Sequence, residues 1–221
     1  MELNRYLDHT LLRPEAVEID IRGLCDDALI HRFHAVVINP IFVEMATLRL
    51  HGTGVKTCSV VGFSLGAYRT DPKIAEAATA EADGAVEIDI VANLGWLASA
   101  DFTRASKELS EVRRRLASAT LMKVIIETPL LDQGLWPEAM AAVVVDCGAE
   151  FVKTATGFFG PTPVEHVRQL SEYAAGSIKV KAAGGIRTAD QALAMIAAAA
   201  ARIGSSASVA IMQESATLLK K

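Results

Sequence analysis

Short apolar runs rich in β-branched residues alternate along the chain with stretches of helical periodicity. The apolar runs have the length and composition of buried strands, and the segments between them repeat apolar residues every three or four positions. The predicted strands are 6–9, 35–38, 57–62, 85–91, 121–127, 151–154, 178–182 and 202–205. The predicted helices include 19–31, 72–82, 102–118, 136–147, 163–175 and 189–201.

This alternation predicts an α/β fold built on parallel strands. A helix between two strands carries the chain back to the edge where the next strand starts, so that neighbouring strands run in the same direction. Eight such units favour a closed barrel over an open, doubly wound sheet. Because no linker, low-complexity tract or charge block divides the sequence, we expect one domain over residues 1–221, a single (β/α)8 TIM barrel.

Charged residues inside the predicted strands are the main departure from this pattern, since strands of a parallel barrel are normally almost entirely apolar. Alternate residues of a barrel strand face the lumen. This alternation places a set of charged residues in the lumen: Glu87, Asp89, Lys123, Glu127, Lys153, Lys179 and Lys181. For Glu87 and Lys179, a structural ion pair at the bottom of the barrel is an equally good interpretation.

Lys153 and Lys181 carry the strongest indication of chemistry. Each lies toward the C-terminal end of its strand, as Asp89 does, and active sites of such barrels form at that end. A buried ammonium group must be paired, or it must lose its proton through a lowered pKa. Because a neutral lysine amine is the nucleophile that forms a Schiff base with a carbonyl, the sequence predicts carbonyl chemistry.

Glycines after the last two predicted strands indicate a phosphate site. Gly184, Gly185 and Arg187 follow the seventh strand, and Gly204 and Ser206 lie at the end of the eighth. In TIM barrels these two loops commonly hold phosphate through backbone N–H groups and a helix N-terminus. We therefore expect a small phosphorylated substrate.

Composition excludes several classes of partner. The chain has 22 basic and 26 acidic residues, a formal net charge of -4, so nucleic acid is not the expected partner. No stretch of about 18 uncharged apolar residues predicts a membrane span.

Cysteine and histidine usage also narrows the possibilities. Cys25, Cys58 and Cys147 are odd in number and widely spaced, which predicts a reducing, cytoplasmic compartment. We expect neither a metal nor an organic cofactor, because no HExxH motif or Cys/His cluster is present. We place His34 at a helix end, and leave His9 open between a structural role and substrate contact.

Seven motifs in order along the chain carry a family resemblance: LDHTLLRP (7–14), VVGFSLGA (60–67), VEIDIV (86–91), KVIIET (123–128), EFVKTATGF (150–158), KAAGGIRT (181–188) and RIGSSA (202–207). They cover nearly the whole chain, and KTATGF followed by KAAGGIR is a specific signature. The chain resembles the deoxyribose-phosphate aldolases, a family of class I aldolases.

The resemblance implies reversible cleavage of 2-deoxy-D-ribose 5-phosphate to D-glyceraldehyde 3-phosphate and acetaldehyde, a step in deoxyribonucleotide catabolism. It implies that Lys153 forms the Schiff base, that Lys181 lowers the pKa of Lys153, that Asp89 transfers protons and that Lys123 contributes electrostatically. The implied phosphate positions are Gly157, Gly184, Gly185, Arg187, Gly204 and Ser206.

Two other interpretations of the same residues remain open. One is another Schiff-base barrel that acts on a different sugar phosphate. The other is a barrel that binds sugar phosphates as a regulator without turnover. For this chain we expect a homodimer, because dimers are the commonest assembly of soluble enzymes.

Overall fold

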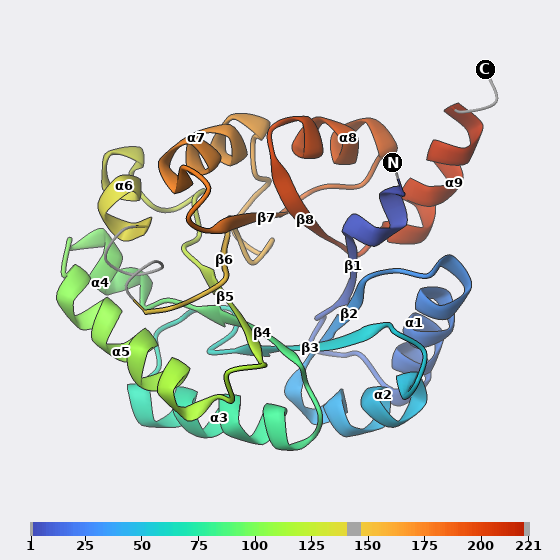
Figure 1. Cartoon of the computed structure of the whole chain (residues 1–221), viewed down its shortest axis with the longest axis horizontal. Helices are drawn as coiled ribbons and strands as arrows, with labels where there is room; N and C mark the ends of the chain where they lie inside the picture. Colours follow the sequence, from blue (N-terminus) through green and yellow to red (C-terminus); the bar gives the residue numbers. More distant parts are fainter. Residues whose placement is uncertain (1, 141–146, 219–221) are drawn as a thin grey trace.

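The computed structural model describes residues 2–140 and 147–218. Within them, parallel strands pair in sequence order and β8 returns to pair with β1, which closes the barrel (Figure 1). The strands are β1 (Leu7–Leu11), β2 (Ala35–Ile38), β3 (Lys56–Val61), β4 (Glu87–Val91), β5 (Leu121–Ile125), β6 (Phe151–Lys153), β7 (Lys179–Ala183) and β8 (Ala200–Ser205). The predicted TIM barrel is therefore confirmed.

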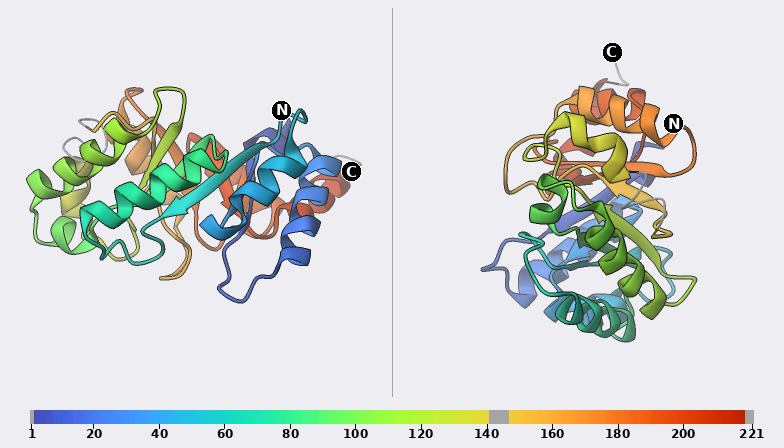
Figure 2. Two further views of the ribbon diagram at one scale, coloured as in Figure 1. Left: turned by 90° about the horizontal axis from the view of Figure 1, so that it is seen from below. Right: turned by 90° about the vertical axis from the view of Figure 1, so that its left-hand side faces the viewer.

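The helices lie outside the ring of strands in Figure 1, and Figure 2 shows them along its flanks. They are α1 (Glu18–His31), α2 (Val43–Leu50), α3 (Thr70–Ala82), α4 (Leu94–Ala98), α5 (Phe102–Arg115), α6 (Trp136–Glu138), α7 (Val164–Ala174), α8 (Ala189–Ala197) and α9 (Ser208–Leu218). Short 3-10 helices in the described part of the chain are η1 (Leu3–Tyr6), η2 (Pro40–Phe42) and η3 (Gln133–Leu135). The predicted helix 136–147 begins at Trp136 as expected, but its 141–146 portion lies outside the described residues.

Several predicted boundaries differ from the structure by a few residues, and the largest difference in a fully described segment is between the last predicted helix and the last predicted strand. The sequence predicts a helix over 189–201, whereas α8 ends at Ala197 and β8 already begins at Ala200. Alanine favours helix on its own, so the alanine run gives no local stop signal. The chain turns at Ala199, which has a left-handed φ of 72°, and Ala200 then pairs with Val180 of β7. Pairing that closes the barrel therefore overrides the local helix preference.

Strand residues divide into two faces with different partners. Val124, Val152 and Val180 are buried in the large apolar cluster that joins the strands to the helices. A separate small cluster of Leu12, Val37, Cys58 and Val60 occupies the opposite face of β2 and β3. The lumen is thus apolar beside β2 and β3, and polar beside the later strands.

No helix in the described part of the chain is long and apolar enough to span a membrane.

Candidate active site

Strand register brings the charged residues together. Lys123 lies beside Asp89 across the β4–β5 pair, and Lys153 lies beside Lys181 across the β6–β7 pair. Residues paired in this way on neighbouring parallel strands point to the same face of the sheet. All four side chains are buried, so the barrel places three lysines around one aspartate.

Asp89 is the centre of this cluster. Its Oδ2 atom lies 2.8 Å from the Nζ atoms of both Lys153 and Lys181. Its Oδ1 atom lies 2.8 Å from Nζ of Lys123. A single carboxylate therefore separates three amines that would otherwise repel one another at close range.

The pKa values of the three lysines shift in different directions. Burial lowers the pKa of Lys153, the positive charge of Lys181 lowers it further, and Asp89 opposes both effects only in part. Burial acts in the same direction on Lys181, but Asp8 and Asp89 outweigh it and raise the pKa of Lys181. Lys123 also has a raised pKa, because Asp89 and Glu87 more than offset its burial. Lys153 is thus the member of the cluster whose amine loses its proton most readily.

Asp89 stays ionised in this surrounding. Burial alone would raise its pKa, but Lys123, Lys153 and Lys181 hold the pKa well below its ordinary value. The site therefore combines a fixed carboxylate, two firmly protonated amines and one amine that loses its proton more readily.

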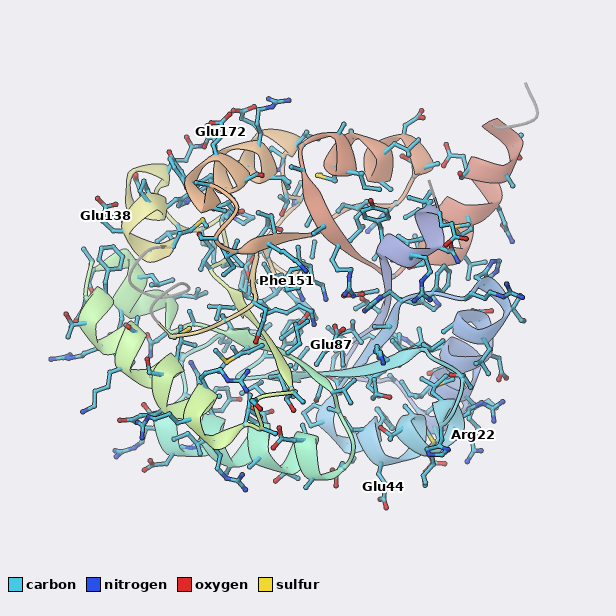
Figure 3. All side chains as sticks on the ribbon, in the orientation of Figure 1. Arg22, Glu44, Glu87, Glu138, Phe151 and Glu172 are labelled. Carbon is cyan, nitrogen blue, oxygen red and sulfur yellow. The ribbon has the colours of Figure 1, made fainter. Side chains whose placement is uncertain are left out.

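A second ring of ionic contacts surrounds the cluster. Asp8 Oδ2 lies 2.6 Å from Lys181 Nζ, and Asp8 Oδ1 lies 3.1 Å from Arg202 Nη1. Glu87 Oε2 lies 2.7 Å from Lys123 Nζ, and its Oε1 lies 3.0 Å from His34 Nε2. Figure 3 shows Glu87 inside the ring of strands, far from the peripheral Glu44 and Glu138.

Sequence reasoning missed Asp8, Arg202 and the role of His34. His34 was expected at a helix end, but it precedes β2 and contacts Glu87. Asp8 could have been found, because the first predicted strand already contained it and alternation puts it on the face opposite His9.

Lys179 was wrongly expected in the lumen cluster. It is exposed at the first position of β7, and its Nζ lies 5.7 Å from the centre of the Phe151 ring. Alternation gave the correct face but not the position along the barrel axis, so the side chain reaches solvent instead of the other charges. The other residue placed in doubt, Glu87, forms the ion pairs described above.

A cavity of about 360 Å³ opens over Lys153. Its wall includes Thr10 of β1 and Arg13 of the β1–α1 connection. All of the phosphate positions expected from the sequence also line this cavity: Gly157, Gly184, Gly185, Arg187, Gly204 and Ser206. The structure thus joins the lysine cluster and the glycine loops in one site.

Backbone geometry explains two of these glycines. Gly184 has a φ of 107°, and a Cβ atom there would lie 3.0 Å from Thr162 Oγ1. At Gly204, a Cβ atom would lie 3.2 Å from Ala183 Cβ and 3.4 Å from Lys181 Cε. Larger residues at these positions would push the loops away from the cavity or displace Lys181.

Metal-binding clusters of three or more His, Cys, Asp or Glu side chains are absent from residues 2–140 and 147–218.

A parallel barrel whose cavity ends on a buried amine is suited to an enzyme but does not define which one, and the comparisons with known proteins identify the class. Residues 4–214 match the model of the DeoC/LacD family aldolases. The chain belongs to this family and is an enzyme, a carbon–carbon lyase. The family resemblance inferred from the sequence motifs is confirmed.

Individual relatives cover the chain almost completely. A deoxyribose-phosphate aldolase of Desulfitobacterium hafniense is 44% identical over 214 residues, 96% of this chain and 98% of the relative. The corresponding enzyme of Finegoldia magna is 42% identical over 96% of this chain and 100% of its own length.

Two solved structures show the same fold at similar coverage. The aldolase QR15 superposes with a TM-score of 0.94 and 37% identity, over 100% of both chains. A tetrameric deoxyribose phosphate aldolase from Aeropyrum pernix gives a TM-score of 0.89 and 32% identity, over 98% of this chain and 92% of its own.

Proposed function

We propose that this aldolase reversibly cleaves 2-deoxy-D-ribose 5-phosphate to D-glyceraldehyde 3-phosphate and acetaldehyde through a Schiff base on Lys153, within deoxyribonucleotide catabolism. The relatives named above support the substrate. The observation that carries the proposal is the position of Lys153: its buried amine has a lowered pKa, contacts Asp89 and lines the cavity that also contains the glycine loops.

Covalent chemistry begins when the neutral Lys153 amine attacks C1 of the open-chain sugar. A C–N bond forms, the carbonyl oxygen takes up a proton, and loss of water leaves an iminium. Removal of the proton from the C3 hydroxyl then breaks the C2–C3 bond, because the iminium accepts the electron pair and becomes an enamine. Glyceraldehyde 3-phosphate leaves, C2 takes up a proton, and water releases acetaldehyde and the free amine.

Asp89 and Lys181 are the proposed proton-transfer pair. Asp89 Oδ2 contacts both Lys153 and Lys181 at 2.8 Å, so one oxygen connects the reacting nitrogen to a second amine. Proton transfer by positioned groups contributes about 10²- to 10⁴-fold to the rate of enzymes that use it. Lys123 holds the other oxygen of Asp89 and fixes the direction in which the carboxylate points.

The glycine loops are the proposed phosphate site. Backbone N–H groups at Gly157, Gly184 and Gly185 lie in stretches with positive φ values, where successive amides can converge on an anion. Arg187 and Ser206 are exposed beside them and line the same cavity. With phosphate held there, the sugar would extend along the cavity toward Lys153.

Two measurements test the proposal. Purified protein should cleave 2-deoxy-D-ribose 5-phosphate in an assay that couples glyceraldehyde 3-phosphate to NADH oxidation. Borohydride added with acetaldehyde should trap a covalent adduct on Lys153, detected by peptide mass spectrometry. Lys153→Ala should abolish the adduct and lower turnover by at least about 10⁴-fold, as nucleophile removal does in other enzymes.

Different failures point to different alternatives. Turnover of another sugar phosphate with an adduct at Lys153 would keep the chemistry and change the substrate. Tight binding of sugar phosphates without any adduct would instead indicate the regulator.

Assembly and location are separate proposals. We propose a homodimer in the cytoplasm. Light scattering at several protein concentrations would test the dimer, since a relative of known structure is described as tetrameric.

A further inference from the structure

Glu127 is a buried carboxyl group that the proposed reaction does not use. It follows β5 by two positions, is 0% exposed and has a left-handed φ of 51°. Residues other than glycine rarely adopt this conformation, and asparagine and aspartate tolerate it better than glutamate does. A glutamate retained in such a conformation indicates that its side chain is needed where it lies.

The side chain of Glu127 holds the segment that follows Lys153. Its Oε2 atom accepts a hydrogen bond from the backbone N–H of Thr156 at 2.9 Å. Next to it, the N–H of Thr128 donates to the Thr154 carbonyl at 2.7 Å, and the N–H of Ile126 donates to the Lys153 carbonyl at 3.2 Å. The connection after β5 thus fixes the 153–156 backbone at three successive points.

The held segment leads directly into the cavity wall. Lys153, Thr156, Gly157 and Phe158 all line the cavity. Gly157 has a φ of 91°, and a Cβ atom there would lie 3.6 Å from the Cα of Gly184. The Glu127–Thr156 bond is therefore one residue away from the point at which the two glycine loops meet.

The surroundings of the second carboxyl oxygen indicate that Glu127 acts as a hydrogen-bond acceptor for the backbone and not as a negative charge. Oε1 of Glu127 is buried without a hydrogen-bond partner among the described residues. Burial raises the pKa of Glu127, although Thr156 and Lys153 act in the opposite direction. An acceptor for the Thr156 N–H is what the position requires, and a neutral amide oxygen would serve as well.

We propose that Glu127 is a positioning residue for phosphate recognition: through Thr156 it places the Gly157 amide against the Gly184 loop, and so selects phosphorylated over unphosphorylated sugars. This inference rests on the proposed function. It predicts that loss of the Glu127–Thr156 bond weakens binding of the phosphorylated substrate, while the amine chemistry at Lys153 continues.

Two neutral amides that differ by one methylene group provide the test. Glu127→Gln keeps the reach to the Thr156 N–H, whereas Glu127→Asn suits the left-handed backbone but is too short to reach it. We expect Glu127→Asn to raise KM for 2-deoxy-D-ribose 5-phosphate about tenfold or more, the scale of a small misplacement in a site. The kcat of Glu127→Asn for 2-deoxy-D-ribose 5-phosphate, and its kcat/KM for unphosphorylated 2-deoxy-D-ribose, should stay within about threefold of the parent values. For Glu127→Gln, kcat and kcat/KM should stay within about threefold of the parent with both sugars.

Glu150→Ala is the control for general destabilisation. Glu150 Oε2 accepts from the Met122 N–H at 2.7 Å, a bond between the same two strands at their N-terminal ends. Its loss should lower the unfolding temperature without changing the preference for phosphorylated sugar.

Three results would overturn the role of Glu127: equal losses for both sugars in Glu127→Asn, no loss in Glu127→Asn, or the same selective loss in Glu127→Gln. If the parent enzyme itself fails to cleave 2-deoxy-D-ribose 5-phosphate, the proposed function fails instead, so the two failures are distinguishable.

Discussion

The protein buries a lysine in two regions, and in both of them the amine has an acidic partner and a lowered pKa. The two regions differ in what else surrounds the amine. Lys153 lies in the lumen, whereas Lys73 lies between α3 and α5, which run side by side on the outside of the barrel in Figure 2. Both side chains are buried, both have an acidic partner, and burial lowers the pKa of both.

The two amines differ in whether their acceptors are shared with another cation and in whether they line a cavity. Lys73 Nζ lies 2.6 Å from Glu108 Oε1 and donates to the Val91 carbonyl at 2.9 Å. Lys153 shares Asp89 Oδ2 with Lys181, and it lines an open cavity. A lowered pKa alone therefore does not distinguish the two lysines. Lys153 differs in that it lines a cavity and shares its acceptor with another cation, which is why it is the proposed nucleophile.

Among the variants in this comparison that keep the Lys153 amine, Lys181→Leu should have the largest effect on activity. Removing this ammonium takes away one cause of the lowered pKa of Lys153 and leaves Asp89 to stabilise the Lys153 ammonium more strongly. The pH optimum should therefore move upward, and kcat should fall about 100-fold or more because proton transfer is lost. The pH profile of kcat/KM for 2-deoxy-D-ribose 5-phosphate measures both effects.

Lys179→Leu is the matched control for that experiment. It removes an exposed lysine two positions earlier on the same strand, so rate and pH profile should stay close to those of the parent. A slower Lys181→Leu enzyme with an unchanged pH profile would contradict the proposed action on the pKa of Lys153.

Lys73→Met should have its main effect on stability. It leaves the Glu108 carboxyl buried without its amine, which costs about 3–5 kcal/mol when one partner of a buried pair is removed. The double variant Lys73→Met/Glu108→Leu removes both charges and should recover much of that loss. Urea unfolding measures the free energy, and the folded single variant should keep kcat/KM within about threefold of the parent because Lys73 lies outside the cavity.

An equal loss in the single and double variants would show that the buried charge of Glu108 is not the cause. A loss of activity comparable to that of Lys181→Leu would show that the two regions are less separate than their positions imply.

Lys153→Met should have the smallest effect on stability, and in the opposite direction. Since the pKa of Lys153 is lowered in the folded protein, protonation of this site favours the unfolded chain. Asp89 keeps Lys123 and Lys181 as partners in the variant. We expect Lys153→Met to stabilise the inactive protein at neutral pH by about 1 kcal/mol, within the range of such stability–function trade-offs.

The pH dependence of this gain follows from linkage. The cost of a lysine with a lowered folded pKa is largest at low pH and disappears as the pH rises to the ordinary lysine value of 10.5. Urea unfolding of both proteins from pH 7 to pH 10 should therefore show a narrowing gap. A gap that widens with pH would mean that the pKa of Lys153 is raised instead.

The sequence predicts which face a residue occupies better than where it lies along the barrel axis. Alternation within the strands correctly buried Asp89, Lys123, Lys153 and Lys181, because side chains on one strand must alternate. The same rule gave the face of Lys179 but not its exposure, since alternation contains no information on how far along the barrel axis a residue lies. The roles proposed for these residues stay predictions until the variants are measured.

Contacts between individual side chains of distant segments were not predicted. Arg202 meets Asp8 because β8 pairs with β1; the predicted barrel implies this pairing but not which side chains it brings together. Lys73 was missed for a different reason. The sequence TDPKIAEA reads as an ordinary amphipathic helix, in which lysine normally faces solvent, and only the packing of α5 against α3 covers it.

Closure of the barrel between Asp8 and Arg202, 194 positions apart, has a consequence for protein synthesis. At roughly 5–20 residues per second, a ribosome needs about 10–40 s to add Arg202 after Asp8 has been made. For most of that interval the N-terminal strand carries the Asp8 carboxylate, which is buried in the folded protein, before either of its partners Lys181 and Arg202 has been made. A chain that stops before Arg202 should therefore lack this contact and the β8–β1 pairing, and we expect it to be inactive.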